Sequence, residues 1–449
     1  MNDRKQTSNE VTIVGGGLAG VEAAWQLAQR GVHVALYEMR PLCRTPAHNT
    51  DFLGELVCSN SLGADQPTSS GGILKQELRR LGSLILAVAE KSRVPAGKAL
   101  AVDRDAFARC LTREMDAHPC IRVVREEVQR VPEGAVILAS GPLTSRTLAD
   151  SLKTLVGEDF LSFFDAAAPI VTVESIDPSK SYRAGRYGQG EDYINCPLSK
   201  EEYDAFVQAL VSAERAIPHA FESEGESRYF EGCLPVEVLA SRGAETLRFG
   251  PMRPVGLPDP VTGKEPWALV QLRQDNREGT LFNLVGFQTS LRWGEQERVF
   301  RMIPALANAD FVRKGVMHQN LFLCAPRVLD GFLRLRDRKD LFFAGQMCGV
   351  EGYVESTAMG LVSALWMFSL LKGEALPLWP RETAIGSLLY YLVSALPQTF
   401  QPMNTNLGIF PPLEQRVKKK SDRCAVYAER SHRELEFFLE KHPDYTPAI

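Results

Sequence analysis

The feature that most constrains the fold of this chain is a glycine-rich turn between a short apolar strand and a helix. Residues 11–14 are all β-branched and suit a buried parallel strand, and residues 21–30 suit a helix that Gly31 ends. A turn of the Gly-x-Gly-x-x-Gly type in this setting binds the diphosphate of a dinucleotide, because the amides and dipole at the helix N-terminus favour an anion. The turn consists of Gly15, Gly16, Gly17, Leu18, Ala19 and Gly20.

Three glycines of this turn have separate tasks, and an acid follows them at the expected distance. Gly15 permits the tight turn, Gly17 lets the backbone approach a diphosphate, and Gly20 lets the helix pack against the strand. A second strand is expected over 32–37, and Glu38 ends it. A carboxylate about 20 residues past the glycines accepts hydrogen bonds from an adenosine ribose. A glycine-rich turn without a ligand is the alternative, but the order of strand, turn, helix, strand and acid favours a dinucleotide site.

A second strand–glycine–helix unit, far along the chain, indicates which dinucleotide is bound. An apolar strand leads into Gly345 and Gln346, and Gly352 and Tyr353 precede a helix expected over about 356–371. Flavoproteins return to the ribityl chain and pyrimidine ring at such a unit, which NAD-only dehydrogenases do not need. The usual acid is replaced by Gln346, so an amide is expected at the ribityl chain. The unit therefore predicts FAD.

The sequence between the two flavin segments has a different character and predicts an inserted domain. Strand-like runs at 170–173, 267–272 and 280–285 alternate with helical stretches such as 201–216. We expect an α/β fold, a Rossmann-type FAD-binding domain like that of glutathione reductase with an inserted α+β domain. Two domains suit a chain of 449 residues. The expected boundaries are 1–168 for the first part of the FAD-binding domain, 169–323 for the inserted, substrate-facing domain, and 324–449 for the second part with C-terminal helices.

Composition restricts the compartment and the partners. The chain is 45% hydrophobic and 24% charged with a net charge of −4, which argues against a uniformly basic surface. The N-terminus lacks the apolar core of a signal peptide, and the apolar run at 359–371 is too short to span a bilayer. Nine cysteines without a Cys-x-x-Cys pair give no sign of a metal site. We therefore expect a cytoplasmic protein that does not bind a membrane, with reduced thiols. Its oligomeric state stays open.

Five motifs spread along the chain resemble one protein family. They lie at 45–48, 55–61, 230–237, 345–353 and 403–412, and the segment around Cys233 discriminates best. These motifs look like TrmFO, the folate- and FAD-dependent tRNA (uracil-5-)-methyltransferases related to the GidA-type flavoproteins. The resemblance covers nearly the whole chain. A second complete phosphate-binding fingerprint is absent from the sequence, so NAD(P)H is expected as a transient reductant.

The resemblance implies a reaction that needs a reactive cysteine. Methylenetetrahydrofolate donates a carbon, reduced flavin supplies electrons, and C5 of a T-loop uridine in tRNA receives the methyl group. A thiolate that adds to uracil C6 makes C5 nucleophilic, and a thiol with an ordinary pKa of about 8.5 needs activation for this step. Cys233, in a Gly-Cys-Leu-Pro turn, is the expected nucleophile. Cys58, before a Ser-Asn-Ser run typical of helix caps, is the expected flavin-side cysteine, although the reverse assignment is nearly as well supported.

Other residues are weaker candidates, and other functions remain open at this point. Glu231 and Glu237 flank Cys233 and suit an acid or base, although solvated glutamates are the commoner explanation, and His48 is either a flavin-side residue or a structural loop histidine. Two alternatives to the methyltransferase are a GidA-like enzyme that modifies the wobble uridine and a non-catalytic, flavin-stabilised RNA-binding factor. The residues considered for RNA or folate contacts are Arg292, Arg298, Arg301, Lys418, Lys419 and Lys420, with Trp293 and Tyr353 as stacking aromatics.

Overall fold

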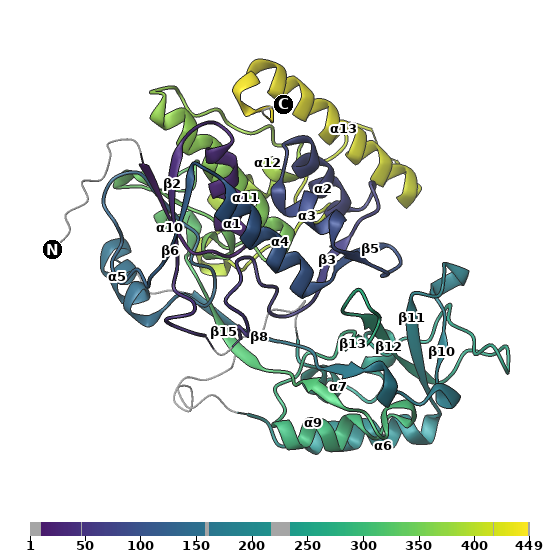
Figure 1. The fold of residues 1–449 in the computed structure, drawn as a ribbon. Helices are drawn as coiled ribbons and strands as arrows, with labels where there is room; N and C mark the ends of the chain where they lie inside the picture. Colours follow the sequence, from purple (N-terminus) through teal and green to yellow (C-terminus); the bar gives the residue numbers. More distant parts are fainter. Residues whose placement is uncertain (1–9, 46, 158–160, 217–233, 416, 448–449) are drawn as a thin grey trace.

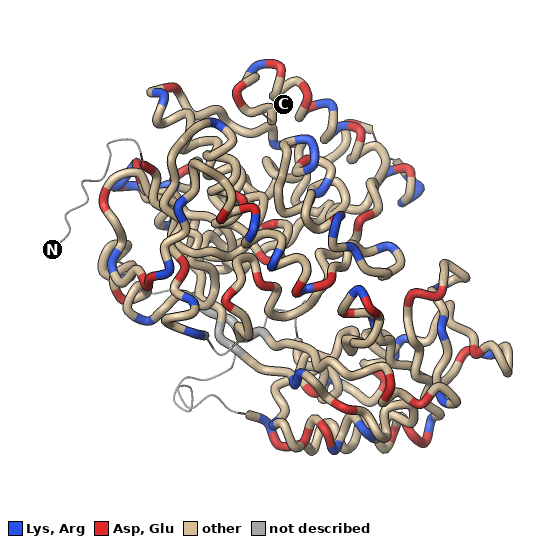
Figure 2. Tube along the Cα trace, viewed as in Figure 1, with Lys and Arg blue, Asp and Glu red and all other residues tan. Residues whose placement is uncertain are grey.

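The structure is a computed structural model that describes residues 10–45, 47–157, 161–216, 234–415 and 417–447. Its two lobes are of unequal size, and the larger one contains both described ends of the chain (Figure 1). Lys and Arg are interspersed with Asp and Glu over both lobes (Figure 2).

The larger lobe is built on a six-stranded sheet in the order β16-β17-β7-β1-β2-β6. Strands β17, β7, β1, β2 and β6 run parallel, and β16 pairs antiparallel at the edge. The predicted first strand, turn and second strand thus lie at the centre of a doubly wound sheet, as the phosphate-loop pattern requires. The strands are β1 (Glu10–Val14), β2 (His33–Glu38), β6 (Ile121–Arg125), β7 (Val136–Leu138), β16 (Arg334–Leu335) and β17 (Arg338–Phe343).

Two helices from opposite ends of the sequence pack closely together against this sheet. Helix α1 (Leu18–Ala28) follows the phosphate loop, and α11 (Tyr353–Leu371) follows the distant glycine unit. A Cβ on Gly360 would lie 2.2 Å from the Ala19 carbonyl oxygen, so only glycine permits this approach. By length and composition α11 is apolar enough to cross a membrane, but 72% of its apolar window is buried inside the protein. It is a core helix of the larger lobe.

The remaining helices of this lobe lie around the sheet, and the last two of them belong to the C-terminal part of the chain. A small sheet in the order β3-β5-β4 lies beside α2 and α4. The helices are α2 (Ser70–Arg80), α3 (Leu84–Lys91), α4 (Arg104–Ala117), α5 (Arg146–Val156), α10 (Ala325–Val328), α12 (Ala384–Ser394) and α13 (Lys420–Lys441), and the small strands are β3 (Ser61–Ala64), β4 (Arg93–Val94) and β5 (Ala99–Val102).

The smaller lobe has a separate hydrophobic core under a second six-stranded sheet, in the order β10-β11-β12-β13-β9-β14. Its pairings are antiparallel, and its helices pack on the sheet through buried aromatic rings such as Phe206, Phe287 and Phe300. The elements are β9 (Ile170–Thr172), β10 (Tyr182–Arg183), β11 (Tyr193–Leu198), β12 (Ala268–Gln274), β13 (Leu281–Leu284), β14 (Phe311–Arg313), α6 (Lys200–Ser212), α7 (Val236–Ser241), α8 (Thr246–Phe249) and α9 (Trp293–Phe300).

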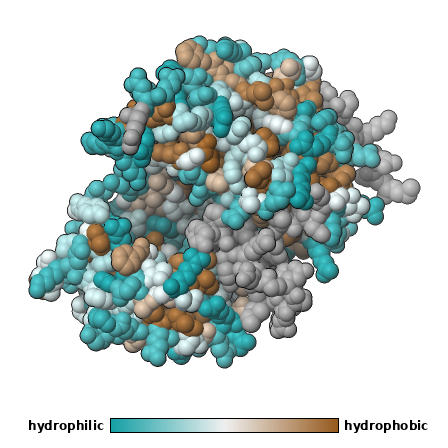
Figure 3. Space-filling model, turned by 180° about the vertical axis from the view of Figure 1, so that it is seen from behind, coloured by the Kyte–Doolittle hydropathy of each residue, from teal (hydrophilic) through white to brown (hydrophobic). Residues whose placement is uncertain are grey.

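A two-stranded ladder connects the lobes. Strand β8 (Leu161–Ala166) leads into the smaller lobe and β15 (Met317–Phe322) leads out of it, and the two pair antiparallel from Leu161↔Phe322 to Ala166↔Met317. The chain thus leaves and re-enters the larger lobe at neighbouring positions (Figure 1). Seen from the opposite side, the surface is hollowed between the lobes (Figure 3).

Candidate functional site

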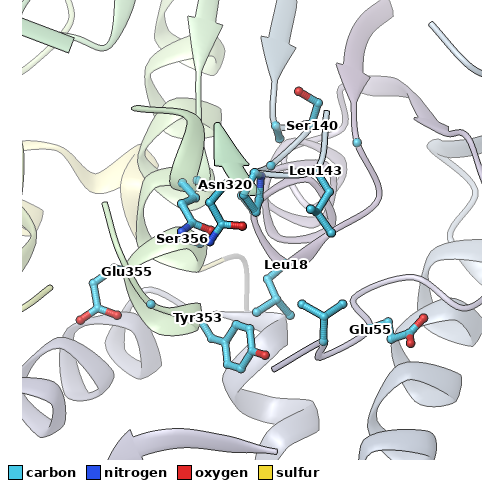
Figure 4. A pocket seen from close by; sticks show the side chains of 18 of the residues that line it. Leu18, Glu55, Ser140, Leu143, Asn320, Tyr353, Glu355 and Ser356 are labelled. Carbon is cyan, nitrogen blue, oxygen red and sulfur yellow. The ribbon is translucent and has the colours of Figure 1, made fainter. Parts of the chain in front are cut away.

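A cavity of 630 Å³ lies at the carboxyl ends of β1, β7 and β17, where a doubly wound sheet holds its ligand. Side chains from α1, α11 and β15 converge on it, among them Leu18, Tyr353 and Asn320 (Figure 4). The predicted flavin residues in its wall are Gly15, Gly16, Gly17, Leu18, Ala19, Glu38, Gly345, Gln346, Gly352 and Tyr353. Of the predicted set, Gly20 does not line the cavity and instead lies where α1 meets the loop.

The geometry of the loop explains which positions require glycine. Gly15 has φ +110°, and a Cβ there would lie 2.4 Å from the Ala139 carbonyl oxygen. A Cβ on Gly20 would lie 1.8 Å from the Gly15 carbonyl oxygen. A Cβ on Gly17, in contrast, would meet nothing within 4 Å and would project into open space beside the cavity. Gly17 therefore leaves room for a ligand, whereas Gly15 and Gly20 leave room for the protein itself.

The carboxylate of Glu38 already has protein partners. Its oxygens accept hydrogen bonds from the Gly16 amide at 3.1 Å and from the Arg40 amide and Nε at 2.9 and 3.0 Å. Although burial raises the pKa of Glu38, the hydrogen bonds and charge of Arg40 outweigh it and hold the pKa below its ordinary value. Arg40 is also buried and bridges to Glu55 at 2.9 Å. Glu38 therefore fixes the loop as an anion that faces the cavity.

The distant glycine unit brings a carboxylate to the site that sequence reasoning missed. The Gln346 amide donates a hydrogen bond to the carboxylate of Glu351, and both residues line the cavity. Gly345 has φ +71° and Gly352 has φ +117°, conformations that glycine adopts without strain. The acid absent directly after the Ala-Gly pair is thus supplied five residues later. The signal in the sequence was the pair of glycines, Gly345 and Gly352, because glycines permit the turns that bring Glu351 back to Gln346.

Two orphaned polar atoms show that the cavity suits a polar ligand. Within the described part of the chain, the buried Asn320 Oδ1 and Thr405 Oγ1 have no hydrogen-bond partner. Both residues line the cavity. Burying such atoms without partners costs about 1–3 kcal/mol each, so a ligand with hydrogen-bond donors would recover that energy. A phosphate loop, an open Gly17 and these atoms together fit a dinucleotide such as FAD.

Cys58 lies in the cavity wall, but its local setting differs from the expectation. The Ser-Asn-Ser run predicts a helix cap, whereas Ser61 begins strand β3 and no helix follows Cys58 until α2 at Ser70. The prediction of a helix start was wrong, because Ser59 and Asn60 are held by side chains from other elements. The backbone amide of Cys58 still donates a hydrogen bond, to the Tyr353 hydroxyl at 2.9 Å.

Tyr353 couples the Cys58 segment to the start of α11. Its hydroxyl oxygen accepts from the amides of Cys58 and Ser59, and the hydroxyl donates to the Cys58 sulfur at 3.3 Å. Burial and the neighbouring thiol raise the pKa of Tyr353 well above its ordinary value, so the hydroxyl remains a proton donor. The sulfur is thereby placed as an acceptor, which suits a thiolate.

The second predicted cysteine and its neighbours have different outcomes. Cys233 and Glu231 lie outside the described residues. Glu237 is fully buried in α7, where its carboxylate accepts from the Thr289 hydroxyl at 2.9 Å and the Ser290 amide at 2.7 Å. It does not line the cavity. Glu237 therefore ties α7 to the segment before α9, and it is neither a cavity-facing acid or base nor a solvated glutamate.

Most of the weaker candidates lie at the surface, where three arginines form ion pairs. His48 lines the cavity, and its Nδ1 lies 2.6 Å from the Thr45 hydroxyl. The arginines at 292, 298 and 301 form ion pairs with Glu214, Glu295 and Glu297. Trp293 is 60% exposed at the start of α9, and the basic run 418–420 is exposed where α13 begins, at Lys420. None of these surface residues lines the cavity.

Lys75 is a further cavity residue that the sequence does not single out. It lies on α2 with only 1% of its surface exposed, and its ammonium donates to the Ala64 carbonyl at 2.8 Å. Burial lowers the pKa of Lys75 to about 8, against the charge of Glu355, which raises it. A lysine at a position of α2 that packs inward was the available signal, but the pattern alone does not tell a core-facing from a cavity-facing position.

Known proteins share both the sequence and the fold. Residues 10–375 match the family model for glucose inhibited division protein A. The chain is 58% identical to a methylenetetrahydrofolate–tRNA-(uracil-5-)-methyltransferase TrmFO of Moorella thermoacetica, over 94% of this chain and 97% of that one. It is 57% identical to the TrmFO of Desulforudis audaxviator, over 96% and 98%.

A solved structure agrees with this relationship at the level of the fold. The structure of Aquifex aeolicus GidA superposes with a TM-score of 0.69 at 15% identity, covering 96% of this chain and 74% of that one. The chain therefore belongs to the GidA protein family and, within it, to the TrmFO group.

Proposed function

We propose that this chain methylates C5 of a T-loop uridine in tRNA, to give 5-methyluridine, with methylenetetrahydrofolate as the carbon donor. The observation that carries the proposal is the position of Cys58 in the wall of a cavity built around a phosphate loop. A flavin site alone would suit many oxidoreductases. A cysteine held at the flavin cavity by the hydroxyl of Tyr353, in a chain so similar to TrmFO proteins, favours nucleotide methylation.

The proposal assigns a task to each part of the chain. The loop from Gly15 to Gly20, with Glu38, binds FAD at its diphosphate and adenosine, and Gly345, Gln346, Gly352 and Tyr353 bind it at the other end. When bound, FAD supplies electrons that come from NAD(P)H. The segment 169–323 forms the substrate-facing domain between two parts of the FAD-binding domain, 1–168 and 324–449. The enzyme acts in the cytoplasm.

Two cysteines share the covalent chemistry in this proposal. Cys233 adds as a thiolate to uracil C6, and C5 then attacks the methylene carbon of the folate. Loss of the C5 proton and release of tetrahydrofolate leave an exocyclic methylene, which the two electrons supplied through FAD and a proton convert to the methyl group as the Cys233 thiolate leaves C6. Cys58, whose sulfur accepts a hydrogen bond from Tyr353, acts on the flavin side. The exchanged assignment, with Cys58 as the nucleophile at C6, predicts the same loss of activity in both alanine variants.

The test uses purified protein, undermethylated tRNA, NAD(P)H and methylenetetrahydrofolate labelled in its one-carbon unit. We expect labelled 5-methyluridine from the unaltered chain, and at least a hundredfold less from Cys58→Ala and Cys233→Ala while both retain FAD. Cys424→Ala is the matched control, because Cys424 lies on α13 and does not line the cavity. Full activity in both variants, or incorporation from S-adenosylmethionine instead of folate, would overturn the proposal.

A further inference from the structure

Three arginine side chains hold the short segment that carries Cys58. Arg104 donates to the Leu56 carbonyl at 2.7 Å, and Arg313 donates to the Val57 carbonyl at 2.7 Å. Arg273 donates to the Ser59 hydroxyl at 2.8 Å and, through Nε, to Asn60 Oδ1 at 3.0 Å. The residues immediately before and after Cys58 are therefore all fixed by guanidinium groups. We call Arg104, Arg273 and Arg313 the arginine triad.

Two of the three members come from the smaller lobe. Arg273 is on β12 and Arg313 ends β14, whereas Arg104 begins α4 in the larger lobe. Arg104 also pairs with Asp275, just after β12, at 3.1 Å. The triad thus crosses the boundary between the lobes at the point where the cavity wall contains Cys58. Separation of the lobes would remove the contacts that Arg273 and Arg313 make and leave only the contact of Arg104.

Burial makes these contacts energetically important. Arg273 is 7% exposed and the side chain of Arg104 is 10% exposed, so their charges are poorly screened by water. Arg104 Nη2 is buried and has no partner among the described residues. Burial lowers the pKa of Arg273 and Arg313, but an arginine guanidinium stays protonated at neutral pH. The segment around Cys58 is therefore under a concentrated positive charge.

The acidic groups near the triad offset this charge only in part. Asp275 pairs with Arg104, and Glu55 accepts from Arg40 at 2.9 Å, so both carboxylates are already partnered. The Tyr353 hydroxyl, 3.3 Å from the Cys58 sulfur, interacts with the charges of all three arginines. Among the described residues, three cations against Asp275 leave a positive excess around the hydroxyl and the segment that carries the sulfur. A positive excess favours a thiolate over a thiol.

We propose that the arginine triad, two members of which belong to the inserted domain, is a positioning device that fixes the Cys58 segment and holds the Cys58 side chain as a thiolate. The proton leaves to solvent, and no co-reactant is needed. The inference rests on the proposed function only in making Cys58 the reactive cysteine of the flavin side. It adds that the smaller lobe, besides facing the substrate, controls the reactivity of a cysteine that belongs to the larger lobe.

The test measures the rate of Cys58 alkylation by iodoacetamide against pH, by mass spectrometry of the Cys58 peptide, in FAD-bound protein without tRNA or folate. The unaltered chain should show a midpoint below the value of about 8.5 of an ordinary thiol. Arg273→Gln and Arg313→Gln should each raise the midpoint by about one pH unit. Arg273→Lys, which keeps the charge, should restore most of the shift but not the rate of methylation, because it loses the fork that joins Ser59 and Asn60.

A variant with the opposite expected sign keeps the test decisive if the glutamine variants fold poorly. Asp275→Asn removes a negative charge beside Arg104 with little change of shape and should lower the midpoint. Arg248→Gln is the matched control, an arginine of the smaller lobe that donates to the Trp267 carbonyl at 2.8 Å. Unchanged midpoints in the Arg273, Arg313 and Asp275 variants with FAD retained would overturn the proposal. Because the readout needs no methyl transfer, that result would leave the proposed function intact.

Discussion

At the scale of single residues, glycine has two roles in the phosphate loop that the sequence pattern does not distinguish: Gly17 leaves room for a ligand, and Gly20 leaves room for the protein backbone. We predict that Gly17→Ala folds with an unchanged melting temperature, because its Cβ meets nothing within 4 Å, but binds FAD at least tenfold more weakly, a loss of about 1.4 kcal/mol. Gly20→Ala should instead destabilise the protein by about 3 kcal/mol, because its Cβ would overlap the Gly15 carbonyl. Calorimetry of the FAD-free protein and a flavin titration measure the two effects. Equal melting temperatures for the two variants would contradict the distinction.

The same scale shows what the sequence can and cannot predict about the site. The loop residues could be predicted, because strand, turn and helix are consecutive and the geometry is local. The Arg40 contacts of Glu38 and the Gln346–Glu351 contact could not, because they depend on the direction of each side chain. Glu237 was misjudged since a glutamate beside a cysteine motif gives no sign of whether it is buried. A polar residue can be structural or catalytic, and its role can be assigned only from the structure that surrounds it.

At the scale of elements, one buried carboxylate joins three helices. Glu77 on α2 accepts from the amides of Ala384 and Ile385 at 2.6 and 2.9 Å, at the N-terminus of α12, and from the Ser431 hydroxyl on α13. An acid at a helix N-terminus satisfies amides that have no intrahelical partner. Burial nevertheless raises the pKa of Glu77 to about 7, against these hydrogen bonds, which lower it.

This raised pKa predicts a pH dependence of stability with a definite sign. The folded state binds a proton on Glu77 up to about pH 7, whereas the unfolded carboxyl loses it near its ordinary value of 4.5. The contribution of Glu77 to stability therefore falls as the pH rises from 5 to 8, by about 2 kcal/mol relative to Glu77→Gln. Urea unfolding of both proteins at several pH values measures this difference. Glu440→Gln, at an exposed position of α13, is the control, and a difference independent of pH would show the prediction to be wrong.

Elements themselves were largely predictable where their periodicity is strong. The predicted helix over 201–216 corresponds to α6 (Lys200–Ser212), and the strands at 170–173, 267–272 and 280–285 correspond to β9, β12 and β13. The segment after Cys58 forms a strand, and not the start of a helix, because it pairs with β5. This partner lies about 40 residues later in the chain. Pairing at such a distance leaves no trace in a local window.

At the scale of the whole molecule, the contact with tRNA should depend strongly on salt. The net charge is −4 and charges of both signs cover both lobes, so binding of a polyanion relies on local groups of Lys and Arg. We predict that tRNA affinity falls at least about tenfold between 50 and 200 mM salt. Filter binding at fixed pH measures this, with FAD retention as the control for an intact protein. A flat response would contradict a contact dominated by phosphates.

The arrangement of the lobes was only partly predictable. The return of the Rossmann pattern near residue 324 indicates an insertion, but nothing local indicates that β12 and β14 reach the cavity wall. Arg273 and Asn60 are 213 positions apart and meet only in the folded chain. The cysteine motif was recognisable, whereas the charges that surround it were not, because they belong to elements with no motif of their own.

The register of the β8–β15 ladder determines which part of the chain could be exchanged as a unit. Its paired strands end at Ala166 and Met317, opposite each other in the register, so everything between them occupies the place of a β-turn. A hairpin tip tolerates the addition of chain better than most sites, because the flanking strands keep their pairing. A tight turn in place of residues 167–316 would therefore close β8 and β15 into a hairpin and leave the larger sheet unchanged, and the shortened chain would lack the lobe that reaches back to the cavity.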